Sequence, residues 1–102
     1  MKHRLPKKIA AAMKSHPAFY QSVWRACCEI PRGEVRIYGW IAKRVGKPKA
    51  ARAVGQALGK NPFAPIVPCH RVVGANGRMT GYSGTGGIAR KRRMLRAEGV
   101  PV

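Results

Sequence analysis

Residues 38–59 read YGWIAKRVGKPKAARAVGQALG, and this stretch decides the fold. Apolar residues recur at helical spacing between residues 38 and 45, which predicts a short helix there. Residues 46–48 predict a tight turn, and residues 49–59, rich in alanine and glycine, predict a second helix. Two short helices joined by a glycine-containing turn resemble a helix-turn-helix. We therefore expect a mainly α fold, a small single domain with a winged helix-turn-helix-like core and a short strand or extended segments.

The segments that flank this core carry clear local signals. Residues 18–30 place apolar side chains at a helical period and predict an amphipathic helix with one buried face. A turn at residues 31–34 ends that helix, and residues 35–38 alternate like a short strand. Residues 88–97 predict a basic helix, which Glu98-Gly99 closes with glycine as the C-terminal cap.

The length of the chain, 102 residues, is that of one domain with a small core. We expect residues 1–18 to form a basic N-terminal arm and residues 19–102 to form the folded domain. Residues 61–68 form a connection punctuated by prolines, and residues 74–87 form a glycine-rich loop.

Charge is the most extreme property of the composition, with 21 Lys and Arg residues against three acidic residues and a formal net charge of +18. Such self-repulsion implies a polyanionic partner, and nucleic acid fits better than a membrane surface because no long amphipathic basic helix stands out. No stretch approaches the roughly 20 apolar residues that span a bilayer, and no secretory signal is recognisable. We expect a cytoplasmic protein associated with DNA or the nucleoid. The alternative is a basic surface that only confers solubility.

Cys69 lies beside His70 in the string Pro-Cys-His-Arg-Val of residues 68–72. A thiol must become a thiolate to act as a nucleophile, and a neighbouring imidazole can assist. The other cysteines, Cys27 and Cys28, are adjacent and have neither disulfide-framework nor zinc-site spacing. We therefore expect reduced thiols, no metal and no cofactor.

The second predicted helix carries Arg52 among Ala50, Ala51, Ala53 and Gly55. Small side chains let a helix approach another surface closely, and a long cation on such a face can enter a groove or a base stack. The alternative is ordinary helix packing with Arg52 as a solvated charge.

Seven separate segments, taken together and in order, form a recognisable pattern. They are PRGEV (31–35), YGWIA (38–42), KAARAVG (49–55), NP (61–62), PCHRVV (68–73), GYSG (81–84) and LRAEG (95–99). In this order they resemble the C-terminal domain of the O6-alkylguanine-DNA alkyltransferases, also called methylated-DNA–protein-cysteine methyltransferases. The resemblance covers about residues 19–99.

The resemblance implies DNA repair by a single-turnover transfer. A cysteine thiolate takes the alkyl group from O6 of guanine, with O4-alkylthymine as a further substrate, and keeps it. Cys69 is then the acceptor, His70 the base that acts through a bridging water, and Glu98 the carboxylate that orients His70. Tyr82 would donate its hydroxyl to the leaving base, and Ser83 would assist at O6.

The resemblance also implies that the damaged nucleotide rotates out of the duplex while the second helix enters the minor groove. Arg52 would fill the space left in the stack, Tyr38 would press on the adjacent phosphate, and Asn61 would fix the turn that leads to the cysteine segment. The DNA-binding residues implied are Tyr38, Ala51, Arg52, Ala53, Gly55, Arg71 and Ser83. The partner is double-stranded DNA with alkylated guanine, bound by a monomer or cooperatively.

This chain departs from its full-length relatives in three respects. Only residues 1–18 precede the first matched helix, so we expect the relatives' N-terminal domain, and any metal site in it, to be absent. The loop after Gly84 is longer than the usual pattern. The last helix is also denser in cations, which would add DNA affinity; they are Arg90, Lys91, Arg92, Arg93 and Arg96.

Two other functions remain open. Short alkyltransferase-like proteins bind the lesion and flag it without chemistry, but they lack the acceptor cysteine that Cys69 supplies here. A transcription-type helix-turn-helix protein would explain the charge but not the Cys69-His70 pair.

Overall fold

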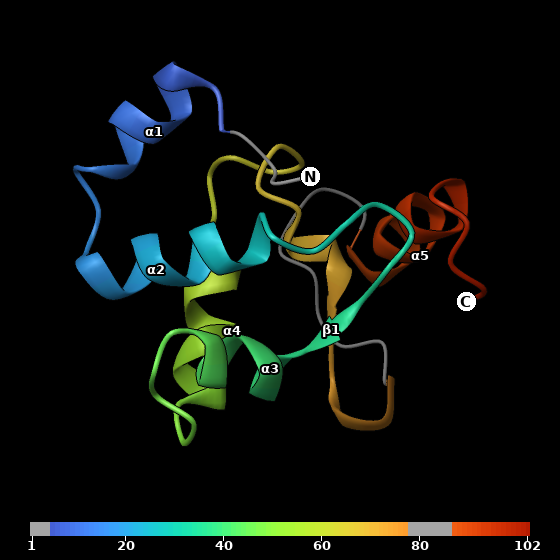
Figure 1. The fold of residues 1–102 in the computed structure, drawn as a ribbon. Helices are drawn as coiled ribbons and strands as arrows, with labels where there is room; N and C mark the ends of the chain where they lie inside the picture. Colours follow the sequence, from blue (N-terminus) through green and yellow to red (C-terminus); the bar gives the residue numbers. More distant parts are fainter. Residues whose placement is uncertain (1–4, 78–86) are drawn as a thin grey trace.

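The computed structural model describes residues 5–77 and 87–102, and Figure 1 shows how the helices lie around a short sheet. The elements in chain order are α1 (Lys7–Met13), α2 (Ala18–Cys27), β1 (Arg36–Ile37), α3 (Tyr38–Arg44), α4 (Ala51–Gly59), the 3-10 helix η1 (Cys69–Arg71), β2 (Val72–Val73), the 3-10 helix η2 (Ala75–Gly77) and α5 (Gly87–Ala97). This mainly helical architecture confirms the predicted fold class.

The helices predicted from periodicity are present, with ends that differ by one to three residues. α2 stops at Cys27 rather than at residue 30. The amides of Glu29 and Ile30 bond back to the carbonyls of Ala26 and Cys27, which tightens the final turn before Pro31.

The start of α4 is shifted for a similar reason. The Ala50 amide bonds to the Lys47 carbonyl at 2.9 Å, which closes a turn around Pro48. The helix therefore begins at Ala51 instead of residue 49.

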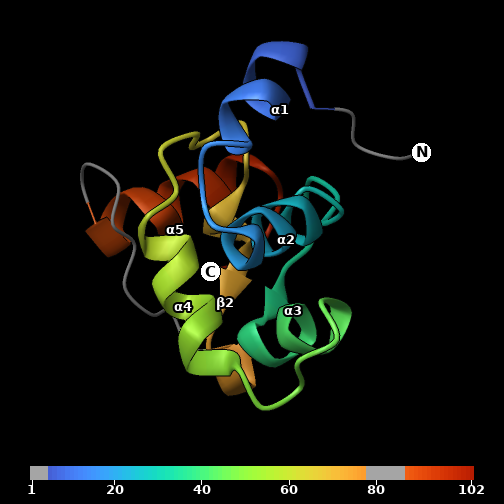
Figure 2. The ribbon, with the colours of Figure 1, turned by 90° about the vertical axis from the view of Figure 1, so that its left-hand side faces the viewer.

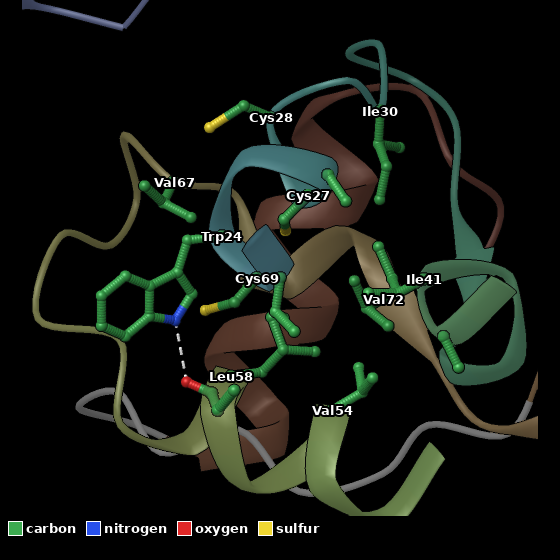
Figure 3. Packing of buried hydrophobic residues seen from close by; sticks show 14 of the residues in the cluster. Trp24, Cys27, Cys28, Ile30, Ile41, Val54, Leu58, Val67, Cys69 and Val72 are labelled. Carbon is green, nitrogen blue, oxygen red and sulfur yellow. Dashed lines mark hydrogen bonds between the residues drawn. The ribbon is translucent and has the colours of Figure 1, made fainter. Parts of the chain in front are cut away.

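Helices α2, α3 and α4 pack against one another and form the helix-turn-helix core, with α3 and α4 side by side in Figure 2. Trp24 of α2 is fully buried, and the rings of His16 and Phe63 meet it edge-on at 5.0 and 5.6 Å between centroids. Its indole N–H donates to the carbonyl of Ala57 in α4 at 2.8 Å (Figure 3). Trp24 therefore joins α2 to α4 through both packing and a directed hydrogen bond.

Helix α1 lies within the segment expected to be a basic arm. Its Met13 is fully buried, and Leu5 and Ile9 pack against the same apolar cluster. The lysines of the helix and of its C-terminal end, Lys7, Lys8 and Lys14, are exposed. None of the helices in residues 5–77 and 87–102 is both long and apolar enough to cross a bilayer.

Strands β1 and β2 pair in parallel, with Arg36 opposite Val72 and Ile37 opposite Val73. The alternation in residues 35–38 predicted the first strand but not its partner. The pairing matters for function because β2 directly follows η1, so the sheet fixes the position of Cys69 and His70 relative to the start of α3.

The turn at residues 31–34 packs against the C-terminal end of α5. Gly33 has φ +91°, and a Cβ at this position would lie 3.1 Å from the Glu98 carbonyl oxygen, so both conformation and space favour glycine. Arg32 Nη2 donates to the Ala97 carbonyl at 2.9 Å, which places a cation at the negative end of the α5 dipole.

Substituting Trp24→Phe tests the link between α2 and α4. We expect the free energy of unfolding to fall by about 2 kcal/mol, because the change removes one hydrogen bond and leaves a cavity. Urea denaturation measures the loss. The half-buried Trp40→Phe is the matched control, and an equal loss in both variants would contradict a special role for Trp24.

Candidate active site

Cys69 opens η1 at the end of the proline-rich connection, and only 7% of it is exposed. Its amide donates to the Val67 carbonyl at 2.8 Å, which holds the segment in a tight turn. Figure 3 shows its sulfur among apolar side chains of the core. Burial raises the pKa of the Cys69 thiol, while a hydrogen bond from Asn61 and the positive charge of Lys91 act to lower it.

Asn61 links the end of α4 to the cysteine segment. Its Nδ2 donates to the Val67 carbonyl at 3.0 Å, and its Oδ1 accepts from the Phe63 amide at 2.8 Å. Both ends of the side-chain amide are therefore used to shape residues 61–67, the turn that leads to Cys69.

His70 is 2% exposed and directly follows Cys69 in the chain. Its Nε2 is 3.0 Å from Oε2 of Glu98. Burial lowers the pKa of His70, and the hydrogen bond and charge of Glu98 only partly oppose this effect. Nδ1 is buried and makes no hydrogen bond to any of the residues that the structure describes. The imidazole is therefore neutral at pH 7, with Nδ1 as its remaining proton acceptor.

Two side chains, the guanidinium of Arg71 and the imidazole of His70, hold the Glu98 carboxylate. Arg71 Nε donates to Oε1 at 3.0 Å and Arg71 Nη2 donates to Oε2 at 2.8 Å, while His70 approaches Oε2. Burial works against ionisation, but the hydrogen bonds from Arg71 and His70 lower the pKa of Glu98 to about 2. The carboxylate is thus charged at neutral pH, and its orientation is fixed by a bidentate contact.

The structure corrects the prediction that Arg71 contacts DNA. Only 7% of Arg71 is exposed, and its third donor, Nη1, bonds to the Ile30 carbonyl at 2.9 Å. Its guanidinium joins Glu98 to the end of α2, so it positions the site from inside the protein.

Lys91 was expected to add DNA affinity together with the other cations of the last helix, and the structure places it inside the domain instead. It is 1% exposed. Burial lowers the pKa of Lys91, while the nearby thiols of Cys69 and Cys27 act to raise it. A signal was present in the sequence, because Lys91 lies four residues before the buried Leu95 and hence on the inner face of α5.

The helix predicted to enter DNA presents its small residues and one cation to solvent. Ala51 and Arg52 are exposed, and Ala53 and Gly55 are half-buried. A Cβ at Gly55 would meet nothing within 4 Å, so the surface there is open. Tyr38, half-buried, begins α3. Tyr82 and Ser83 lie outside the described residues.

The arrangement can support chemistry with a thiol nucleophile. The buried Cys69 directly precedes the neutral His70 in the chain, and His70 lies 3.0 Å from the ionised Glu98, which is the order of residue types that base-assisted thiols use. Within residues 5–77 and 87–102, no group of three or more His, Cys, Asp or Glu side chains could hold a metal ion.

Comparison with known sequences identifies relatives of this domain. Residues 18–100 match the family described as 6-O-methylguanine DNA methyltransferase, DNA binding domain. The methylated-DNA–protein-cysteine methyltransferase of Methanosarcina mazei is 59% identical over 80 residues, which cover 78% of this chain and 49% of the relative. The chain thus spans about half the length of the relatives it matches.

Solved structures agree with this assignment. A Mycobacterium tuberculosis OGT in complex with DNA superposes with a TM-score of 0.78 at 58% identity, covering 81% of this chain and 50% of that one. Schizosaccharomyces pombe Atl1, solved with damaged DNA containing O6-carboxymethylguanine, gives a TM-score of 0.73 at 42% identity and covers 81% of this chain and 77% of that one. These matches confirm the resemblance found in the sequence, and the chain belongs to the O6-methylguanine-DNA methyltransferase family through the DNA-binding domain of that family.

Proposed function

We propose that this domain repairs DNA by moving an alkyl group from O6 of guanine to the sulfur of Cys69, with O4-alkylthymine as a further substrate. The observation that carries the proposal is that the buried Cys69 directly precedes His70, which contacts a Glu98 carboxylate held by Arg71, in a member of a DNA methyltransferase family. We further propose that it acts as a monomer on double-stranded DNA, with no cofactor.

The first step of the proposed reaction is ionisation of the thiol. In the resting protein, burial keeps Cys69 protonated and His70 neutral. The proton passes from Sγ through a bridging water to His70 Nδ1, and Glu98 stabilises the imidazolium that forms. The charge of Lys91 stabilises the thiolate. Holding the thiol in its protonated form until DNA arrives protects it from other alkylating agents and oxidants.

The second step is an in-line displacement. The sulfur attacks the alkyl carbon, a C–S bond forms, and the C–O bond to guanine breaks. The electron pair stays on the guanine, which Tyr82 protonates and Ser83 assists at O6. The thioether formed at Cys69 is stable, so each molecule reacts once.

The lesion must leave the duplex before this attack, because O6 is out of reach of a buried sulfur. We propose that α4 enters the minor groove, where its small residues allow close approach and Arg52 occupies the vacated place in the stack. Tyr38 presses on the adjacent phosphate. Unstacking costs a few kcal/mol, and phosphate contacts with release of counterions offset it.

The likeness to S. pombe Atl1 supports a second candidate, lesion binding without transfer. Cys69, with His70 and Glu98 in contact behind it, favours transfer.

Incubation with a duplex that contains O6-methylguanine separates the two candidates. We expect the intact mass of the protein to increase by one methyl group that maps to Cys69. The Cys69→Ser variant should gain none, because its hydroxyl is a much weaker nucleophile at neutral pH. Cys27→Ser and Cys28→Ser are the matched controls and should still gain the methyl group. Tight binding of the wild type with no mass change would refute transfer and favour lesion flagging.

The pKa of about 2 at Glu98 predicts a pH dependence of stability. A carboxyl whose pKa is depressed by folding stabilises the protein above its unfolded pKa, near 4.5, and this contribution is lost as the pH falls toward 2. Urea denaturation at stepped pH should show a steeper loss for the wild type than for Glu98→Gln. At neutral pH, Glu98→Gln should lower the free energy of unfolding by about 3 kcal/mol, because it leaves the buried Arg71 uncompensated.

The control for this measurement is Glu29→Gln, which removes an exposed ion pair with Arg44. It should follow the wild-type curve. Parallel pH curves for Glu98→Gln and wild type would contradict the assignment of the depressed pKa.

Replacing Lys91 with Met tests the charge beside the nucleophile. Without the cation the pKa of Cys69 should rise, so the pH profile for alkylation of Cys69 by iodoacetamide should move to higher pH. Peptide mass spectrometry reads the modification at each pH. Arg92→Met removes an exposed charge from the same helix and should leave the profile in place. Superimposable profiles for Lys91→Met and wild type would exclude the electrostatic role.

A further inference from the structure

We infer that the outer side of α5 is a second surface that binds the phosphates of duplex DNA, separate from α4. The surface consists of Arg92, Arg93 and Arg96, and we call it the arginine face. This inference rests on the DNA binding in the proposed function, and it adds a contact that the recognition helix does not supply.

The structure divides the cations of α5 into two groups. Lys91 and Leu95 are buried and form the inner side of the helix. Arg92, Arg93 and Arg96 are exposed. Arg96 lies four positions after Arg92 and three after Arg93, and residues three and four positions apart are neighbours on a helix surface, so these three side chains lie on one exposed side of α5. Of the five cations in this helix, three therefore remain for an external partner, with Arg90 half-buried.

The chain has no acidic side chain left to neutralise the arginine face. Its three acids are Glu29, Glu34 and Glu98. Glu29 pairs with Arg44 and Glu34 with Arg36, each at 2.8 Å. Glu98 is taken by Arg71 and His70.

Arg92 and Arg93, two members of the arginine face, have guanidinium groups whose charge and hydrogen-bond donors are not used within the described part of the chain. Arg96 donates through Nε to the Val102 carbonyl. Within the part of the chain that the structure describes, Arg92 and Arg93 form no hydrogen bond or ion pair. Guanidinium groups present paired donors that match phosphate oxygens, so a polyanion is the partner that this geometry fits.

The position of α5 separates this surface from α4. Helix α5 packs on η1, whereas α4 packs on α2 and α3. Figure 1 shows η1 between the two helices, so their outer sides face different directions. A surface on the far side of the nucleophile can contact a flanking part of a bent duplex or a second duplex.

The arginine face is also rigidly joined to the active site. Arg32 bonds to the Ala97 carbonyl at 2.9 Å, and Glu98, the next residue, is fixed by Arg71. A preorganised helix loses little conformational entropy when it binds. Among the described residues of α5, Ile88 is the one large exposed hydrophobic side chain, so the helix lacks the apolar stripe that insertion into a lipid surface requires.

The test is the salt dependence of DNA binding by the triple variant Arg92→Gln, Arg93→Gln, Arg96→Gln. Each lost phosphate contact should make the slope of log K against log salt shallower by about 0.9. We expect the slope to fall by about 2.7 and the affinity at physiological salt to drop by roughly 10- to 100-fold. The matched control is Lys7→Gln, Lys8→Gln, Lys14→Gln, which removes the same charge from α1.

An unchanged slope in the arginine variant, with folding confirmed by its circular dichroism and urea midpoint, overturns the inference. An equal fall in the α1 variant also overturns it, because the effect would then reflect net charge alone. A third outcome would assign the surface to membranes instead: the wild type binds vesicles of anionic lipid, the arginine variant does not, and the salt slope for DNA is the same in both.

Two further measurements identify the source of the phosphates. On a duplex of about one helical turn, roughly 10 base pairs, the slopes of wild type and variant should converge if the face binds flanking DNA. If it binds a second duplex, wild type should bring two differently labelled short duplexes together by energy transfer, and the variant should not. Methyl transfer by the wild type is scored separately: its absence would overturn the proposed function, whereas the salt slopes alone decide on the arginine face.

Discussion

The carboxylate of Glu98 is the point on which the arrangement of this domain depends. It accepts two hydrogen bonds from Arg71 and one contact from His70, and Arg71 also bonds to the carbonyl of Ile30. One partly buried acid therefore connects the end of α5, the cysteine segment and the turn that follows α2. A buried cation without a partner would lower the stability of the fold by several kcal/mol. The three segments are therefore held in the one arrangement that pairs Arg71 with Glu98. The depressed pKa of Glu98, about 2, is the electrostatic sign of that constraint.

The same constraint explains how a chain with a formal charge of +18 can fold around the buried thiol of Cys69. The partly buried Glu98 neutralises the buried Arg71, while Glu29 and Glu34 form exposed pairs that contribute little to stability. Among the described residues, the other cations are exposed or half-buried, and a polyanion would relieve their mutual repulsion. Lys91 is the exception, since it is buried beside Cys69 and its charge favours the thiolate there. The stability of the fold, and the DNA binding and thiol chemistry that we propose, thus depend on one small set of charges.

Local patterns predicted the helices well, because the apolar residues of an amphipathic helix recur every three or four positions along the chain. The periodicity of Val23, Trp24 and Cys27 placed α2, and the turn around Pro48 separated α3 from α4. Strand β2 escaped prediction, because its two residues bond to a segment more than thirty positions away. Arg71 was predicted to bind DNA and Lys91 to add DNA affinity, and both side chains are buried. The sequence does not show whether a long cationic side chain faces solvent or pairs with a buried carboxylate. Only its neighbours in space distinguish these two environments.

The sequence by itself determined the family, the helix-turn-helix order, the excess of positive charge and the Cys69-His70 pair, because these are properties of composition and of neighbouring residues. Tertiary structure alone decided which cations are buried, that Arg71 holds Glu98 through two hydrogen bonds, and which side of α5 carries the exposed arginines. The physical reason is that solvation and pairing energies depend on distance and burial. Both arise when segments far apart in the chain pack together, and no local pattern records them.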